Sequence, residues 1–171
     1  MTKLVRAVAM TCLGSWLAST GAAAQAPAGQ PSQPAPNPGF SGSTTAVADT
    51  LAKWGLVGTW SVDCAGPPGR TNTHTTYTAR PNRTAYYTRQ WGDGGDTEPN
   101  EIDTATIRDD GVLAMTETMP AFKQTREFWL LKGPDGRARA LMNRQVGGDY
   151  TVRDGKFVSN GRETPWSSRC R

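Results

Sequence analysis

The stretch LVGTWSVDC, residues 56–64, alternates in a way that predicts a β-strand. Successive side chains of a strand point to opposite sides, which places on one face Leu56, Gly58, Trp60, Val62 and Cys64. We expect this face to point inward, with Trp60 in the core and Gly58 leaving space one step before it. Cys64 is then expected near one end of the domain interior.

The residues after this strand repeat the period-two pattern between turn signals. The clearest turns are Arg80–Arg83, Arg108–Gly111, Gly133–Gly136 and Asp154–Gly155, where Gly or Asn accepts a positive φ. The strands expected between them are 74–79, 84–91, 100–107, 112–119, 125–131, 137–143, 150–153, 156–158 and 164–170.

This pattern predicts an all-β domain of about eight to ten short antiparallel strands. An open sheet of that size tends to curl, so a closed meander or a sandwich is expected. We favour an up-and-down barrel. A short helix over residues 46–54 precedes it, with Thr44 or Thr45 as its cap and Gly55 as its end.

Residues 1–24 have the composition of a signal peptide. Lys3 and Arg6 form a basic start, residues 7–18 are mostly apolar, and the run Ala22–Ala24 suits a cleavage site before Gln25. We therefore expect export to the periplasm or to the outside of the cell, with no membrane span after the signal is removed.

Removal of the signal also removes Cys12 and leaves two cysteines. In an oxidising compartment Cys64 and Cys170 are expected to form a disulfide. Trp166, Ser168 and Cys170 share one face of the last predicted strand, so we expect that face to point inward and the disulfide to tie the two ends of the barrel together.

The mature chain divides into two parts. Residues 25–45 are rich in Pro, Ala, Gln and Ser and are predicted to be a disordered linker. Residues 46–171 are predicted to form the barrel domain. Loss of Lys3 and Arg6 lowers the formal net charge from +4 to +2, and the arginines are scattered. We therefore expect no nucleic-acid partner.

The motif Gly58-Thr59-Trp60 resembles the start of the lipocalin-like (calycin) barrels. In those barrels a short helical turn precedes a Gly-x-Trp strand, and an arginine near the C-terminus packs across the Trp. Arg169 is the matching arginine here, so the resemblance implies a cation–π contact with Trp60. By simple alternation, however, Arg169 faces outward. The sequence is also similar to small exported proteins with an N-terminal GTW…DC and a C-terminal W…RC.

No residue set predicts catalysis, a metal site or a cofactor. His74 is the only histidine, and no acidic partner is evident for it. Glu117 and Glu127 lie on successive strands, where two facing carboxylates would suit acid–base chemistry. Strand charges facing solvent are the simpler interpretation. We therefore do not expect an enzyme.

An excess of aromatic side chains is the main indication of function. It lies on two predicted strands and comprises Tyr86, Tyr87, Trp91, Phe128 and Trp129. Alternation buries about half of them, and the others face solvent, a pocket or a partner. With Trp60, four of them (Tyr86, Tyr87, Phe128 and Trp129) form the predicted ligand-binding set for an apolar or aromatic small molecule. The alternative is an envelope protein-interaction or protease-inhibitor module that acts through its surface or its N-terminal segment.

Overall fold

The computed structural model describes residues 46–171, so the predicted signal peptide and linker lie outside the described residues. The helix α1 (Val47–Trp54) ends at Gly55, whose φ of 83° is left-handed, as the sequence predicts. Its start differs from the prediction. Ala46, not a threonine, occupies the cap position and makes no side-chain capping hydrogen bond. Contacts of the buried face of α1 with the sheet therefore stabilise this helix.

The strands agree with the predicted pattern, although half of them are shorter than predicted and β7 and β8 are longer. They are β1 (Gly58–Ser61), β2 (His74–Ala79), β3 (Ala85–Trp91), β4 (Gly94–Gly95), β5 (Asn100–Ile107), β6 (Leu113–Met119), β7 (Gln124–Lys132), β8 (Ala138–Gln145), β9 (Tyr150–Arg153), β10 (Lys156–Phe157) and β11 (Ser168–Arg169). The residues between β6 and β7 form a single 3-10 turn, η1 (Pro120–Phe122). The two-residue strand β4 lies between two predicted strands, in a segment where no strand was expected.

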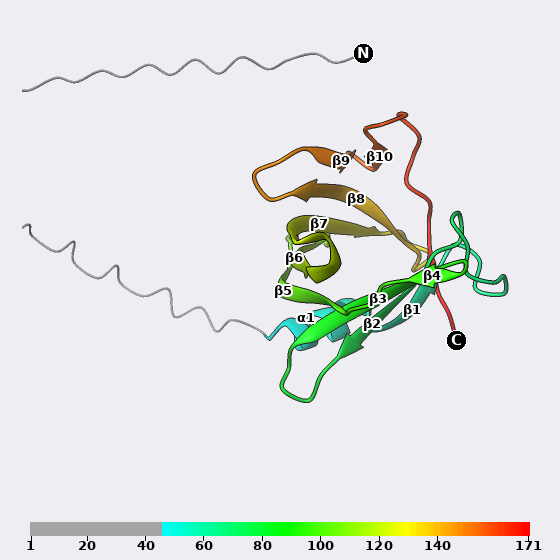
Figure 1. The fold of residues 1–171 in the computed structure, drawn as a ribbon. Coiled ribbons are helices and arrows are strands. Elements are labelled where there is room, and N and C mark those ends of the chain that lie inside the picture. The colour runs from blue at the N-terminus through cyan, green and yellow to red at the C-terminus, as the bar shows by residue number, and fades with distance from the viewer. Residues whose placement is uncertain (1–45) are drawn as a thin grey trace, which may run out of the picture. The chain divides into compact units, whose positions relative to one another are not determined.

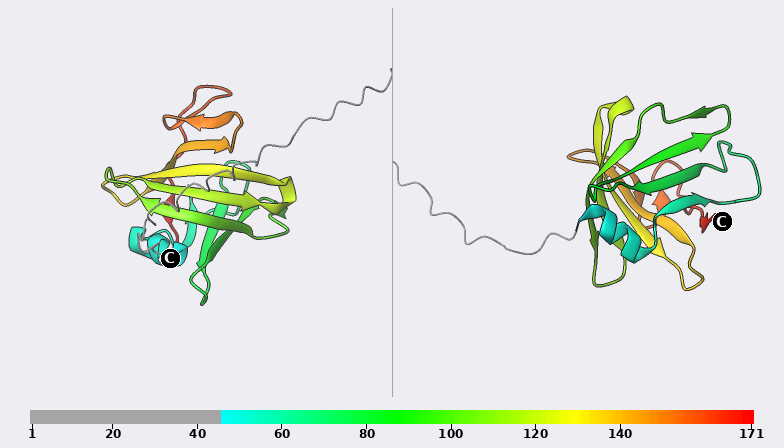
Figure 2. Two further views of the ribbon diagram at one scale, coloured as in Figure 1. Left: turned by 90° about the vertical axis from the view of Figure 1, so that its left-hand side faces the viewer. Right: turned by 90° about the horizontal axis from the view of Figure 1, so that it is seen from below.

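All strands belong to one antiparallel sheet in the order β10-β9-β8-β7-β6-β5-β3-β2-β1-β11, with β4 paired to β3. The sheet curls until β8 approaches the segment before β11 (Figures 1 and 2). There Ala138 and Ser167 exchange two backbone hydrogen bonds of 2.9 and 2.8 Å. The result is a curled, partly open barrel, which confirms the predicted fold class.

The prediction that Trp166, Ser168 and Cys170 of the last strand point inward is wrong. Trp60 pairs with Arg169, and opposed residues of an antiparallel pair share a face. Ser167 and Arg169 therefore point to the Trp60 side, and Trp166 and Cys170 do not. The prediction set the phase by requiring an inward Cys64, but β1 already ends at Ser61.

The Cys64–Cys170 disulfide is present, with a Cα–Cα distance of 5.3 Å. It lies beyond the ends of β1 and β11, next to the backbone hydrogen bond from Cys170 N to Thr59 O, which is 2.7 Å long. Val62 is 44% exposed, which confirms that the strand does not continue inward to Cys64. The disulfide thus ties the first and last strands together from outside the barrel interior.

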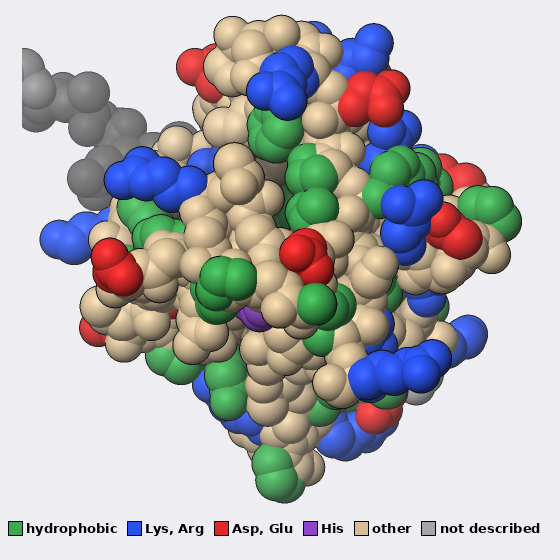
Figure 3. Space-filling model, turned by 90° about the vertical axis from the view of Figure 1, so that its right-hand side faces the viewer, with side chains coloured by type: hydrophobic (Ala, Val, Ile, Leu, Met, Phe, Trp, Pro, Cys, Tyr) green, Lys and Arg blue, Asp and Glu red, His purple; other side chains and the backbone are tan. Residues whose placement is uncertain are grey.

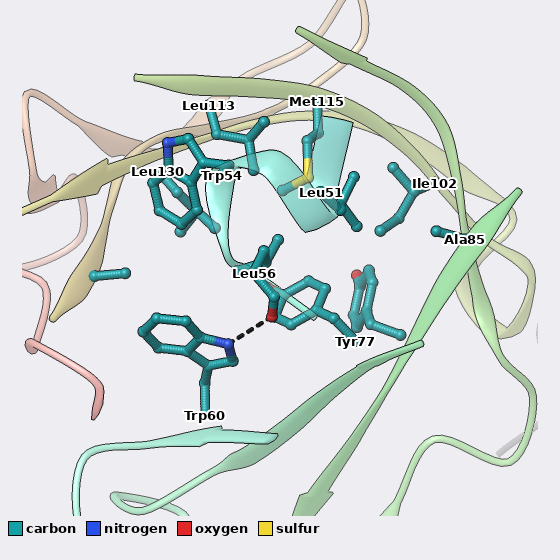
Figure 4. Close-up of a cluster of buried hydrophobic side chains, with 12 residues drawn as sticks. Leu51, Trp54, Leu56, Trp60, Tyr77, Ala85, Ile102, Leu113, Met115 and Leu130 are labelled. Atoms are coloured by element: carbon teal, nitrogen blue, oxygen red, sulfur yellow. Dashed lines mark hydrogen bonds between the residues drawn. The ribbon is translucent and has the colours of Figure 1, made fainter. Parts of the chain in front are cut away.

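The hydrophobic core lies between α1 and the concave face of the sheet. Leu51 and Trp54 of α1 point toward side chains of β5, β6 and β7 (Figure 4). The Trp54 indole N–H donates to Gly111 O at 2.9 Å, so the helix is also fixed to the turn between β5 and β6. No helix of residues 46–171 is long and apolar enough to cross a membrane.

Candidate functional site

The barrel contains a half-open cavity of about 390 Å³, which is within the usual range for small-molecule sites. Part of its wall is apolar and comprises Leu56, Trp60, Phe128, Leu130, Val152 and Phe157. The rest is polar, with Thr75, Tyr77, Arg89 and Asn143 among its members. On one face of the molecule, hydrophobic side chains border a hollow (Figure 3).

Trp60 is held rigidly in this wall. Its indole N–H donates to Leu56 O at 2.6 Å, and its side chain is 5% exposed. Gly58, two residues earlier, has a φ of 121°. A Cβ at Gly58 would lie 2.8 Å from Nε of Arg169, so the glycine leaves room for that guanidinium. Among residues 46–171 no cation–π contact joins Arg169 to Trp60.

The structure separates the predicted aromatic residues into three groups. Trp60 and Phe128 line the cavity. Tyr87 is buried behind Tyr77, with 5.5 Å between their ring centroids, and it does not reach the cavity. Tyr86 and Trp129 lie on the outer face.

The outward aromatic rings are covered by arginines of the same chain. The Arg80 guanidinium lies 4.3 Å from the Tyr86 ring centroid and makes a bidentate ion pair with Glu101. Arg108 lies 4.4 Å from the Trp129 ring centroid. These contacts account for the outward half of the aromatic excess without a partner molecule.

The carboxylates of Glu117 and Glu127 do not face one another. Glu127 pairs across the strands with Thr116, whereas Glu117 pairs with Arg126, so the two glutamates are on opposite faces of the sheet. Glu127 is an outer residue and accepts a hydrogen bond from Arg144 Nε at 2.7 Å. The acid–base pair considered from the sequence is therefore wrong.

Glu117 instead belongs to a buried polar cluster in the barrel, which we define as Tyr87, Arg89, Asp96, Asn100 and Glu117. Asp96 accepts hydrogen bonds from Arg89 Nε at 3.1 Å, Arg89 Nη2 at 3.0 Å and Asn100 Nδ2 at 2.7 Å. The Asp96 side chain is 2% exposed. Paired charges of this kind are costly to bury unless their hydrogen bonds are satisfied, as those of the Asp96 carboxylate are here.

The Glu117 carboxyl is 3% exposed. Burial raises its pKa to about 7, against the opposing effects of a hydrogen bond with Tyr87 and of the nearby Arg89 and Arg126. Burial, followed by the charge of Glu117, raises the pKa of Tyr87 as well. The cluster thus contains a carboxyl group that changes its charge near neutral pH.

Four residues near the cavity were not predicted from the sequence: Tyr77, Arg89, Asp96 and Arg126. Arg89 could have been predicted, because Tyr87 and Arg89 share a face of one strand and a buried Tyr87 turns Arg89 inward. Asp96 follows β4, between two predicted strands, where the sequence has no periodic pattern that would place its side chain.

His74, at the start of β2, is half-buried. Its Nε2 lies 3.3 Å from Asn72 Nδ2, and no carboxylate contacts it among the described residues. No cluster of three or more metal-ligating side chains occurs in residues 46–171.

Among the hollows outside the barrel, two are compared with the cavity. One, of about 490 Å³, is formed around β3 and β4, and its lining is glycine and polar side chains apart from Pro68. The other, of about 260 Å³, is on the outer face of β7–β9 and includes Trp129 and Tyr150. The interior cavity is larger than the hollow on β7–β9, and more of its wall is apolar than in the hollow at β3–β4.

No protein-family model, curated protein or solved structure matches this chain. The resemblance to the lipocalin-like barrels therefore stays a prediction.

Proposed function

We propose that this protein is an exported binding protein that holds a small apolar or aromatic molecule in its barrel. The interior cavity carries the proposal, because it has the volume of a ligand site and an apolar wall built around Trp60 and Phe128. The disulfide is compatible with the periplasm or an extracellular location.

Phe128 and Trp129 provide a matched pair of test residues. They are neighbours on β7, but Phe128 lines the cavity and Trp129 is on the outer face. We expect Phe128→Ser to weaken binding of the neutral fluorescent probe N-phenyl-1-naphthylamine at least tenfold, a loss of about 1.4 kcal/mol. Trp129→Ser is expected to leave the affinity unchanged, because its side chain does not reach the cavity.

A variant that fills the cavity tests the same proposal from the opposite direction. Ala140 lines the cavity, so Ala140→Phe is expected to exclude the probe. Native mass spectrometry of protein purified from its own compartment then shows whether a small molecule is bound. Equal probe binding by the wild type and by both cavity variants would contradict an interior site.

A surface-interaction or inhibitor module is the second candidate. The hollow on the outer face of β7–β9, called the outer groove below, is the feature that favours a surface-interaction role, because it includes Trp129 and Tyr150. Arginines already cover both rings: Arg108 contacts Trp129, and Arg153 lies 4.5 Å from the Tyr150 ring centroid. A partner would have to displace these contacts, so the interior cavity supports the first proposal better.

A further inference from the structure

One cation faces the cavity from its wall. Arg89 and Arg139 are in the wall, and no aspartate or glutamate is. Arg139 is opposite Leu131 of β7, and its guanidinium pairs with Glu163 at 3.1 Å and lies 4.9 Å from the Trp166 ring centroid. Arg89 is therefore the positive charge that the wall offers beside its apolar surface.

Arg89 is oriented by its neighbours. The Asp96 carboxylate holds its Nε and Nη2, whereas Nη1 donates to no other residue of the described part of the chain. The Arg89 side chain is 27% exposed and lines both the interior cavity and the outer hollow at β3–β4. An anion in the cavity would meet a guanidinium whose position is already fixed.

Arg126 is a second cation close to the cavity. Its guanidinium donates to Asn143 Oδ1 at 2.6 Å, Gln124 Oε1 at 3.2 Å and Thr151 Oγ1 at 2.9 Å, all neutral acceptors. It makes no ion pair within residues 46–171. Asn143 and Thr151 both line the cavity, so Arg126 adds positive charge directly behind the wall.

Glu117 is the buried acid between these two cations. It lies opposite Arg126 on the next strand, and it is close enough to Arg89 to feel its charge. The other titratable groups that face it are Tyr77 of β2, Tyr87 of β3 and Asp96 after β4. Because it is buried, Glu117 responds strongly to any charge added nearby.

We propose that the cavity binds a small organic anion with its charged group against Arg89, and that Glu117 takes up a proton when the anion binds. This inference rests on the proposed function and specifies the ligand class. The apolar body of the ligand lies along Trp60 and Phe128. The bound negative charge opposes ionisation of Glu117, so the carboxylate takes a proton from solvent and becomes the neutral acid.

Thermodynamic linkage then fixes the direction of the pH dependence. If the anion promotes proton binding, a proton on Glu117 promotes anion binding by the same factor. Burial already holds the pKa of Glu117 at about 7. A further rise of one pKa unit on binding corresponds to about a fivefold gain in affinity as the pH falls from 8 to 6, out of about tenfold over the whole pH range.

Two probes with the same alkyl chain test the proposal in the wild-type protein. Decane-1-sulfonate stays an anion throughout this pH range, whereas decan-1-ol is neutral. Isothermal titration calorimetry in buffers of different ionisation enthalpy measures the protons exchanged on binding. We expect the sulfonate to bind with net proton uptake near pH 7 and more tightly at pH 6 than at pH 8. The alcohol is expected to bind with neither effect.

Three substitutions assign the proton. Glu117→Gln is expected to abolish proton uptake and flatten the pH dependence for the sulfonate. Glu127→Gln is the matched control, because it changes a glutamate on the outer face, and His74→Gln removes the only imidazole. Both controls are expected to keep the uptake. If Glu117→Gln does not fold, Glu117→Met serves as the second variant, and binding of decan-1-ol shows that its cavity is intact.

The outcomes separate this inference from the proposed function. Binding of decan-1-ol but not of the sulfonate would overturn the anion site and leave the binding function intact. Sulfonate binding without proton uptake, or with uptake that persists in Glu117→Gln, would overturn the role of Glu117. If neither probe binds and no small molecule is retained by native protein, both proposals fail.

Discussion

The two halves of the barrel interior differ in what fills them. Under α1, Leu51, Trp54 and Leu56 are buried among aliphatic side chains. Farther along the same concave face, the polar cluster around Glu117 and Asp96 occupies an equally buried position. The α1 half lowers the free energy of folding by burial of apolar surface. The polar half adds less stability, because buried charges must first lose their water.

This difference indicates which half serves a function beyond folding. An apolar replacement of similar volume is often as stabilising as a buried charged group, or more so. The polar cluster lies next to the cavity, and its Arg89 forms part of the cavity wall. We therefore interpret the α1 half as the structural end of the barrel and the polar half as the functional end.

Removal of the disulfide is expected to lower the unfolding free energy most, since the disulfide joins β1 to β11 and so holds the barrel that contains both halves. It closes a loop with a sequence separation of 106 residues. The double variant Cys64→Ser, Cys170→Ser is expected to lose up to about 4–5 kcal/mol of unfolding free energy. Denaturant titration at constant pH measures this loss. An unchanged denaturant midpoint in the double variant would contradict the structural role of the disulfide.

Removal of a buried side chain from the α1 half is expected to lower the unfolding free energy almost as much as loss of the disulfide. Leu51 is fully buried, so Leu51→Ala should lower the unfolding free energy by about 3 kcal/mol. The loss should be the same at pH 5 and pH 8, because no titrating group is involved. Urea unfolding at both pH values checks this. Ala52→Gly, at an exposed helix position, is the control and should cost about 1 kcal/mol.

Glu117→Gln probes the polar half, where stability should depend on pH. The pKa of Glu117 is raised to about 7 in the folded protein, from 4.5. The folded state therefore binds more protons between these values, and the stability from this group, complete below about pH 4.5, is lost as the pH rises through about 7. The loss reaches up to about 3 kcal/mol.

The variant is expected to lack this decline, so its stability relative to the wild type should improve as the pH increases from 4.5 to 7. Unfolding by urea at several pH values measures the difference. Glu127→Gln, on the outer face, should follow the wild-type curve. Parallel curves for the wild type and Glu117→Gln would show that the two halves do not differ in this respect.

The smallest effect is expected outside both halves. Arg108→Gln removes the cation that covers the Trp129 ring. At such a partly exposed site the loss should be about 0.5–1 kcal/mol. Thermal unfolding measures it, and binding of N-phenyl-1-naphthylamine should not change. A change in probe affinity would mean that the outer groove, not the interior, holds the probe.

Local sequence patterns predicted most of the fold. Gly55 ends the helix because a left-handed residue is needed there, and the turn residues between strands mark most strand ends. The same alternation located Trp60 on the inner face and left open whether Phe128 or Trp129 points inward. Alternation gave the wrong face for Trp166 and Cys170. The inward face of this very short last strand had been chosen on the assumption that Cys64 points inward.

The candidate site was predicted only in part. Phe128 and Trp60 were in the predicted ligand-binding set and line the cavity, whereas Tyr86 and Trp129 of that set lie outside. The sequence pattern left the face of Glu117 open. Its position was decided by the register of β6 against β7, which pairs Glu117 with Arg126 and not with Glu127.

The sequence by itself determined the all-β class, the helix before it, the disulfide partners and the alternation that directs Trp60 inward. These features depend on residues close in the chain or, for the cysteines, on simple pairing. Only the tertiary structure decided which aromatic rings meet a cavity, and that Arg89, Asp96 and Glu117 come together. Those contacts join strands far apart in the sequence, and the register and curl of the whole sheet set them.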